Sequence, residues 1–169
     1  MRGLIKKMLR KFKTFLSKIC ILVIMVNFSC NDDSYIEVKY SPVNYNLEEM
    51  PYQTLSEYNF FEGQIKDLDP VYGVIPYELI SSLFTDYSIK SRFVWMPEGA
   101  TANYISSSSV FDFPLGTILI KNFSYNNVLP EQINRNIETR LMIKKENGWI
   151  FADYIWNDDQ SEAIFNLDG

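Results

Sequence analysis

The sequence predicts a β-rich α+β protein, with an antiparallel sheet of sandwich-like or barrel-like form and one or two short helices. Two observations point to this class. Several runs rich in aromatic and β-branched residues alternate between apolar and polar positions, which is the period of a half-buried strand. An Asn147-Gly148 pair also separates two such runs, and this pair favours a tight hairpin turn.

The N-terminal segment differs in charge from the rest of the 169-residue chain. Seven of the 16 basic residues precede position 19, whereas all 21 acidic residues follow position 31. An apolar run from Ile19 to Phe28 comes next, and it is far shorter than the roughly 20 residues needed to span a bilayer. A basic region followed by a short apolar run is typical of a secretory signal peptide.

The end of this run, Ser29-Cys30, resembles the lipobox of bacterial lipoproteins, although Asn27 departs from the usual leucine-like residue. The resemblance implies removal of residues 1–29 and acylation of Cys30, which would anchor the chain in a membrane. A cleavable signal with an incidental cysteine and an uncleaved N-terminal helix are the alternatives. Residues Asn31–Ser34 resemble a surface-display signal or form a solvated tether, and Asn31 favours the outer membrane, on its periplasmic or cell-surface side.

Composition excludes several kinds of chemistry. The chain has no histidine, so histidine-dependent triads, zinc sites and CxxCH haem attachment are absent from its sequence. Its two cysteines are Cys20, in the signal, and Cys30, so we expect no disulfide and no metal site. Residues 30–169 carry nine basic and 21 acidic residues, a formal charge of −12 that argues against a nucleic-acid partner.

We expect residues 30–53 to form a flexible tether and residues 54–169 the β-rich domain. Leu55, Tyr58 and Phe61 share a face at helical spacing, which predicts a short helix over 54–61. Residues 67–76 contain Pro and Gly breakers and predict a loop, and residues 77–84 predict a helical turn.

The remaining sequence predicts strands. These cover residues 88–96, 102–113, 116–125, 136–146 and 149–156, with a polar loop at 126–135. In the run 136–146, one face carries Ile137, Thr139, Leu141 and Ile143, and the other carries Glu138, Arg140, Met142 and Lys144. Asn147-Gly148 predicts a type I′ turn with positive φ at both positions.

The sequence gives only weak signals for catalytic or ligand-binding residues. Four carboxylates lie close together in the sequence and could perform acid–base catalysis or bind Ca²⁺, but solvated surface charge is the better interpretation. They are Asp153, Asp158, Asp159 and Glu162. Six strand aromatics could line a sugar-binding platform, but core positions are the better interpretation. They are Tyr87, Phe93, Trp95, Trp149, Tyr154 and Trp156.

Two further groups of residues suggest no site. The basic residues Arg92, Arg140, Lys144 and Lys145 are too scattered in the sequence to predict an anion site. The glycines Gly73, Gly99 and Gly116 form no phosphate-binding loop.

Several sequence segments within residues 54–165 are similar to those of a known family: LSEYNFFEG, GVIPYELISSLFTDYSIKSRFVWMPEG, FDFPLGTILIKNFSY, IETRLMIKKENGW and YIWNDDQSEA. They resemble the N-terminal region of a family of lipoprotein diheme c-type cytochromes. The resemblance implies an exported, anchored domain joined to a redox domain that binds haem c. This chain reaches Gly169 without a CxxCH motif, so we expect a truncated form or a short paralogue, with no cofactor of its own.

Three functions follow from these observations. The first is a membrane-anchored accessory domain, non-catalytic on its own, that supports a haem-carrying domain or redox partner in extracytoplasmic electron transfer. The second is a surface lipoprotein that binds a glycan or peptide through exposed aromatic rings. The third is a hydrolase or metal-dependent enzyme using Asp153, Asp158 or Glu162, for which no nucleophile–base pair can be named.

Overall fold

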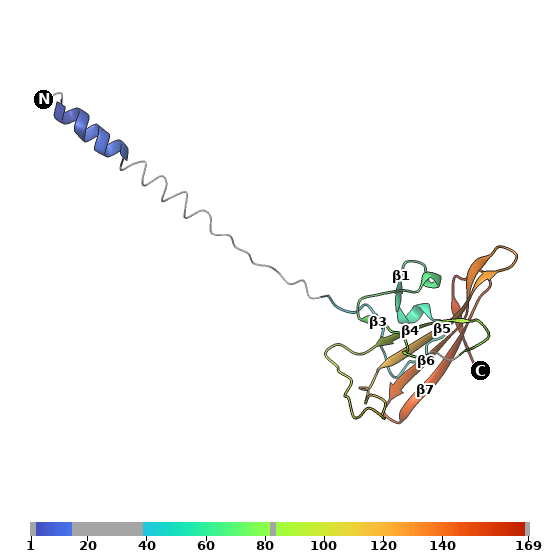
Figure 1. Ribbon diagram of the computed structural model, residues 1–169. Coiled ribbons are helices and arrows are strands. Elements are labelled where there is room, and N and C mark those ends of the chain that lie inside the picture. The colour runs from blue at the N-terminus through green and yellow to red at the C-terminus, as the bar shows by residue number, and fades with distance from the viewer. Residues whose placement is uncertain (1–2, 15–38, 82–83, 168–169) are drawn as a thin grey trace. The chain divides into compact units, whose positions relative to one another are not determined.

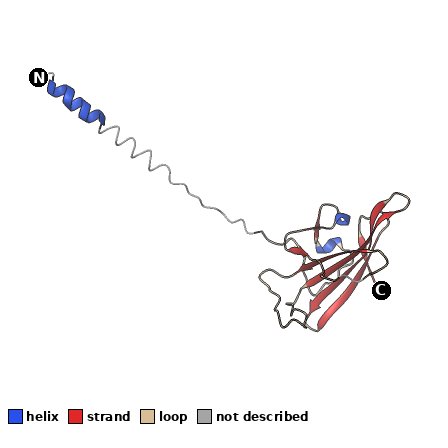
Figure 2. Ribbon diagram, in the orientation of Figure 1, coloured by secondary structure: helices blue, strands red, loops and turns tan. Residues whose placement is uncertain are grey.

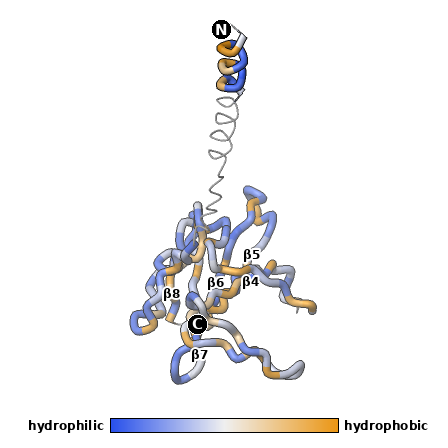
Figure 3. The backbone as a smooth tube through the Cα atoms, turned by 90° about the vertical axis from the view of Figure 1, so that its left-hand side faces the viewer, coloured by the Kyte–Doolittle hydropathy of each residue, from blue (hydrophilic) through white to orange (hydrophobic). Residues whose placement is uncertain are grey.

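The computed structural model describes residues 3–14, 39–81 and 84–167, which belong to two units, Met1–Val38 and Lys39–Gly169. In the first unit, residues 3–14 form a helix with apolar and basic residues on opposite sides (Figure 3). No helix within the described ranges is long and apolar enough to cross a membrane. The predicted apolar run, Cys30 and the acidic residues after it lie outside the described residues.

The second unit is built on one six-stranded antiparallel sheet in the order β3-β4-β5-β6-β7-β8 (Figures 1 and 2). Neighbours in the chain are neighbours in the sheet, and β3 and β8 form its two edges, so the sheet is not closed into a barrel. The predicted β-rich class is confirmed. The strands are β3 (Val74–Pro76), β4 (Ile89–Trp95), β5 (Ile118–Val128), β6 (Ile133–Lys145), β7 (Gly148–Trp156) and β8 (Ala163–Asn166).

One face of this sheet, the inner face, forms the hydrophobic core. Strand pairing places Ile120, Leu141 and Ala152 side by side on β5, β6 and β7, and their exposed fractions are 2% or less. Side chains alternate between the two faces of a strand, so the residues between these point the other way. Complete burial of an aliphatic side chain stabilises the fold by about 1.5–3 kcal/mol.

The inner face is covered by the segment that precedes β4. It contains the 3-10 turns η1 (Ser56–Tyr58) and η2 (Ile65–Asp67) and the two-stranded sheet of β1 (Phe61–Glu62) and β2 (Asp69–Pro70). Phe61 packs edge-on against Phe93 of β4, with ring centroids 5.1 Å apart. Thr54 also forms an antiparallel bridge with Ile164, so the segment both covers the core and pairs with the edge strand β8.

The covering segment begins earlier than the sequence suggested. Residues 30–53 were expected to form a flexible tether, but the compact unit starts at Lys39. Met50 and Tyr52 are 2% and 7% exposed and belong to the core, and Val43 and Leu47 pack against it. These apolar residues are separated by prolines and asparagines, which hides them from any test of helix or strand periodicity.

Two buried tyrosines join the covering segment to the sheet. The hydroxyls of Tyr58 and Tyr154 lie 2.9 Å apart, and both residues are fully buried. The Tyr154 hydroxyl donates to the Tyr52 carbonyl oxygen at 2.8 Å, and the Tyr52 amide donates to the Tyr58 hydroxyl at 3.1 Å. Every polar group in this contact therefore has a partner, as burial requires.

Most of the predicted strands form, with exceptions. The strand predicted over 102–113 is wrong, because that segment is a loop with one isolated bridge, Asn103 to Asp112. The helix predicted over 54–61 is reduced to the turn η1. Residues 77–81 are not helical. The predicted polar loop at 126–135 is mostly strand, because β5 and β6 continue until Val128 pairs with Ile133.

The predicted hairpin between 136 and 156 is confirmed, but its turn and one face differ. Lys145 pairs with Gly148, so Glu146 and Asn147 are the central turn residues, and Asn147 lacks the positive φ that a type I′ turn needs. A bulge near Ile137 shifts the register, so Asn136 faces the core and Ile137 is 41% exposed.

The tyrosine contact predicts a pH dependence of stability. Burial raises the pKa of Tyr58 and of Tyr154, so the folded state keeps protons that the unfolded state releases above about pH 10. The stability from these tyrosines is therefore complete below that pH and is lost above it. Urea unfolding from about pH 8 to 11 should show a steeper loss of unfolding free energy in the wild type than in Tyr154→Phe.

Tyr72→Phe is the control, because Tyr72 is 59% exposed. At neutral pH, Tyr154→Phe should itself cost about 1–3 kcal/mol, because the Tyr52 carbonyl loses its buried donor. Parallel pH profiles for the wild type and Tyr154→Phe would show that the two hydroxyls are not buried together.

Candidate functional site

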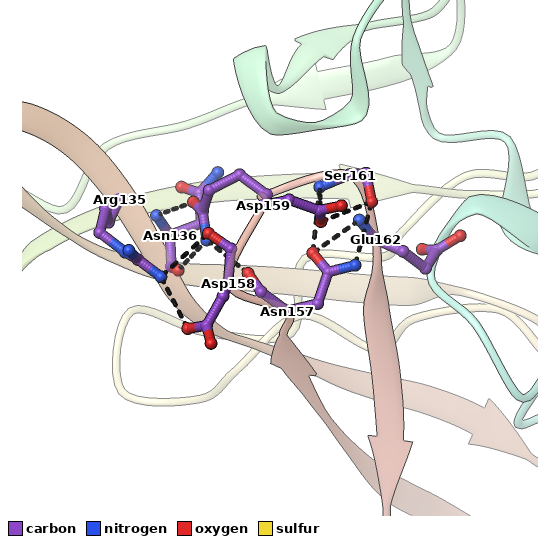
Figure 4. A network of polar contacts seen from close by, with 8 residues as sticks. Arg135, Asn136, Asn157, Asp158, Asp159, Ser161 and Glu162 are labelled. Atoms are coloured by element: carbon purple, nitrogen blue, oxygen red, sulfur yellow. Dashed lines mark hydrogen bonds and ion pairs between the residues drawn. The ribbon is translucent and has the colours of Figure 1, made fainter.

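The predicted carboxylate cluster does not form a site. Asp158 is fully exposed and pairs with Arg135 at 3.1 Å. Asp159 is exposed in the same loop, and the hydroxyl and amide of Ser161 donate to its Oδ1, which lowers the pKa of Asp159 (Figure 4). For these two residues, the interpretation as solvated surface charge is confirmed.

The other two carboxylates have structural partners elsewhere. Glu162 accepts a hydrogen bond from the Ser56 amide at 3.1 Å and another from the Ser56 hydroxyl, so it attaches the loop to η1. Asp153 lies on the opposite face of the sheet, 3.8 Å from the Nε of Arg140. The described residues contain no group of three or more acidic residues or cysteines suited to a metal ion.

A buried polar network lies at the end of the inner face, and its member Asn136 is seen beside the loop residues in Figure 4. The Asn122 Oδ1 accepts from the Thr139 hydroxyl at 2.6 Å and from the Trp156 indole at 3.2 Å. Asn136 connects this group to Gln160, whose Oε1 accepts from the Asn136 amide at 2.6 Å. None of the described side chains has a fully buried nitrogen or oxygen without a partner, so the network holds the fold together and leaves no group aimed at a ligand.

The six candidate aromatics are mainly core residues. Phe93, Trp95, Tyr154 and Trp156 are at most 7% exposed, which confirms the core interpretation for these four. Trp149 is half-buried against Phe113, with ring centroids 5.9 Å apart. Tyr87 alone of the six is strongly exposed, at 87%.

The second face of the large sheet, the outer face, carries an unexpected row of charged side chains. Pairing places Arg92 of β4 opposite Lys121 of β5, Lys121 opposite Arg140 of β6, and Arg140 opposite Asp153 of β7. We call Arg92, Lys121 and Arg140 the cationic row. Arg92 and Arg140, which lie far apart in the sequence and predicted no anion site, are therefore members of one row in the sheet.

The electrostatics of this row are asymmetric. Glu138 is paired with Arg140 at 2.5 Å, and this contact raises the pKa of Arg140. Lys121 forms no ion pair with a described residue, and its ammonium lies 4.6 Å from the centre of the Phe123 ring. Partial burial, followed by repulsion from Arg92 and Arg140, lowers the pKa of Lys121.

Apolar residues border the cationic row on both sides. The row on one side runs through the register positions Ile75, Val94, Leu119, Met142 and Phe151. On the other side, Phe123, Glu138, Ile155 and Ile164 are paired across β5 to β8. Phe151 is 69% exposed, and Ile75, Ile155 and Ile164 are each about half exposed. The outer face therefore combines exposed apolar groups with a band of positive charge.

Sequence reasoning missed this face for a specific reason. Arg92, Lys121 and Arg140 lie 29 and 19 positions apart in the chain, and only the strand register aligns them. The available signal was the alternation itself, since each of these residues stands at a strand position on the face opposite the core. Lys145, by contrast, is unrelated to the row, because its ammonium donates to the Met50 carbonyl at 2.7 Å.

Comparisons of the chain with protein-family models, with curated proteins and with solved structures gave no match. The resemblance to the diheme cytochrome family stays a prediction that rests on the sequence phrases alone.

The different roles of the polar residues predict different mutational costs. Asn136→Ala should lower the free energy of unfolding by about 2–4 kcal/mol, because it leaves the Asn122 side-chain amide and the Lys66 carbonyl without their buried partners. Asp158→Asn should change it by less than about 0.5 kcal/mol, because the side chain is fully exposed. Chemical denaturation of both variants measures the difference in unfolding free energy. An equal loss for Asp158→Asn and Asn136→Ala would contradict the structural role of Asn136 and the exposed position of Asp158.

Proposed function

We propose that the chain is a lipid-anchored, non-catalytic docking domain that binds an acidic protein surface on the outer face of its sheet. The observation that carries the proposal is the cationic row, with its exposed apolar borders, in a unit that is otherwise strongly acidic. Five of the nine basic residues in 30–169 lie on this face, as strand pairing shows: Lys90, Arg92, Lys121, Arg140 and Lys144.

Charge complementarity defines the partner. The outer face holds these five basic residues against the carboxylates Glu138 and Asp153, whereas residues 30–169 as a whole carry a formal charge of −12. Acidic groups on the partner would be attracted to this face and repelled by the rest of the domain. This electrostatic attraction affects the orientation and the rate of association more than the final affinity.

The apolar residues supply the affinity. Phe151 and Ile155 project from β7 on either side of Asp153, and both are substantially exposed. Large apolar side chains at the centre of an interface contribute most of its binding energy, and monomeric proteins rarely leave a large apolar patch exposed. A partner that covers Phe151 would remove this exposed surface from water.

The proposal includes that the domain is non-catalytic, and the positions of its carboxylates support this part. Asp153, Asp158 and Glu162 lie on different elements with different partners, so they do not form an acid–base pair. The enzyme hypothesis therefore loses support, because it depended on these three carboxylates. Capture of a glycan by an aromatic platform loses support too, because four of the six rings are in the core.

The sequence motifs supply the location and the kind of partner. Cys30 would carry the lipid anchor in the outer membrane, and the helix of residues 3–14 matches the basic, amphipathic start of an export signal. The family resemblance would make the partner a haem-carrying domain or redox protein. A reading frame with CxxCH motifs beyond codon 169 would support that identification, and none in any frame would remove it.

Lipid anchoring is tested by comparing two cysteine variants. Cys30→Ala should abolish processing that is sensitive to globomycin and should move the protein from the membrane to the soluble fraction, because the acylated residue is lost. Cys20→Ala is the matched control and should behave as the wild type, since Cys20 belongs to the removed signal. Equal membrane partition of Cys30→Ala and the wild type would rule out the anchor.

Docking is tested by photo-crosslinking from the outer face of the anchored protein in cells. A photoreactive residue in place of Phe151 should give a discrete adduct with an acidic protein. The double variant Lys121→Glu/Arg140→Glu should abolish the adduct, because it reverses the charge that attracts the partner.

The control for that experiment reverses charge elsewhere. Lys66→Glu, on η2 in the covering segment, makes a charge change of the same sign away from the cationic row and should leave the adduct intact. An adduct that survives the double reversal, or one formed equally from exposed Tyr72, would contradict docking on this face.

A further inference from the structure

A small cavity of about 430 Å³ lies between the β3–β4 connection and strand β4. Its lining includes the aromatic rings of Phe84 and Tyr87, the hydroxyls of Thr85 and Ser88, and the cations Lys90 and Arg92. Glu78 is the one acidic residue among the described residues of the lining. The lining therefore combines cationic, hydroxyl and aromatic groups.

Arg92 is the principal charged group of this cavity. The residue is only 8% exposed, and its Nη1 donates one hydrogen bond, to the Lys90 carbonyl at 3.3 Å. It forms no ion pair within the described part of the chain, with Glu78 or with any other carboxylate. Arg92 is one of the residues that line the cavity, and no fully buried side-chain nitrogen of the described residues lacks a partner.

A nearly buried arginine without a carboxylate favours an incoming anion. The guanidinium keeps its charge at any physiological pH and binds carboxylate and phosphate oxygens through two parallel hydrogen bonds. Lys90 lines the same cavity, and Lys121 adds positive potential from the next strand. The lowered pKa of Lys121, caused by burial and then by Arg92, is consistent with this excess of positive charge.

The turn that presents the aromatic wall has an unusual backbone. Asp86 and Tyr87 have φ values of +37° and +61°, and the Ser88 amide donates to the Thr85 carbonyl at 2.8 Å, which closes the turn. A positive φ is uncommon for a residue as bulky as tyrosine and is energetically unfavourable. This turn keeps the Tyr87 ring 87% exposed and edge-on to Phe84 at 5.3 Å.

We propose that this cavity binds a small organic anion, with its carboxylate or phosphate group held by Arg92 and Lys90 and its body against Tyr87 and Phe84. The site shares Arg92 and Lys90 with the basic outer face but requires neither Phe151 nor the apolar rows, so its binding is tested separately from protein docking. It gives the domain a second, small-molecule ligand. The strain in the turn is the cost of keeping the aromatic wall in place.

The test is calorimetric titration of the full chain in detergent with phenyl phosphate, benzoate and inorganic phosphate. Phenyl phosphate, benzoate or both should bind, and their relative affinities show whether phosphate or carboxylate is preferred. Arg92→Gln and Lys90→Gln should each weaken this binding about tenfold or more, because each removes a charged hydrogen-bond donor. Tyr87→Gly should weaken it while raising the thermal stability, since glycine tolerates positive φ.

The matched control is Lys144→Gln, which removes a charge from the same sheet face outside the cavity and should leave the affinity unchanged. Failure of phenyl phosphate and benzoate to bind would overturn the proposal, as would wild-type affinity in both Arg92→Gln and Lys90→Gln. Inorganic phosphate binding as tightly as phenyl phosphate would overturn the role of the aromatic wall. If Arg92→Gln does not fold, the ligand affinities of Lys90→Gln and Tyr87→Gly test the proposal in its place. The crosslink from Phe151 is unaffected by these ligands, so the two proposals fail separately.

Discussion

The burial of only one face of the six-stranded sheet is the constraint on which the other features depend. Residues of the covering segment, joined to β7 through the Tyr58–Tyr154 contact, exclude water from the inner face, where most strand residues are apolar. The strand period of two then directs the intervening residues to the outer face. Arg92, Lys121 and Arg140 lie in one row because their neighbours in the chain are fixed in the core.

This arrangement places like charges side by side at a cost to the isolated domain. Glu138 and Asp153 compensate Arg140, but Lys121 and Arg92 form no ion pair with the described residues. Uncompensated charge at a partly buried position favours the binding of opposite charge, because the attraction is stronger where water is excluded. The acidic partner proposed for the outer face and the anion proposed for the cavity both follow from this imbalance, and Arg92 takes part in both.

Sequence reasoning recovered the elements governed by local rules. The strands at 89–95 and 118–125 and the hairpin near Gly148 follow from alternation and turn chemistry, and the structure contains them. It missed Met50 and Tyr52 in the core, because their burial depends on contacts with distant strands and leaves no periodic signal. The bulge at Ile137 and the alignment of Arg92 with Lys121 and Arg140 are properties of the register, which depends on the whole sheet. The carboxylates Asp153, Asp158 and Glu162 lie on different elements with different partners, which their closeness in the sequence did not reveal.

The most direct test of the account is the pKa of Lys121, measured by NMR titration of its side chain in the full chain in detergent. The account predicts a value below that of an ordinary lysine, because Lys121 is partly buried between Arg92 and Arg140. It also predicts that the pKa rises towards the ordinary value in Arg92→Gln, which removes one of the repelling charges. A Lys121 pKa at or above about 10.4, unchanged by that substitution, would contradict the cationic row and the functions proposed from it.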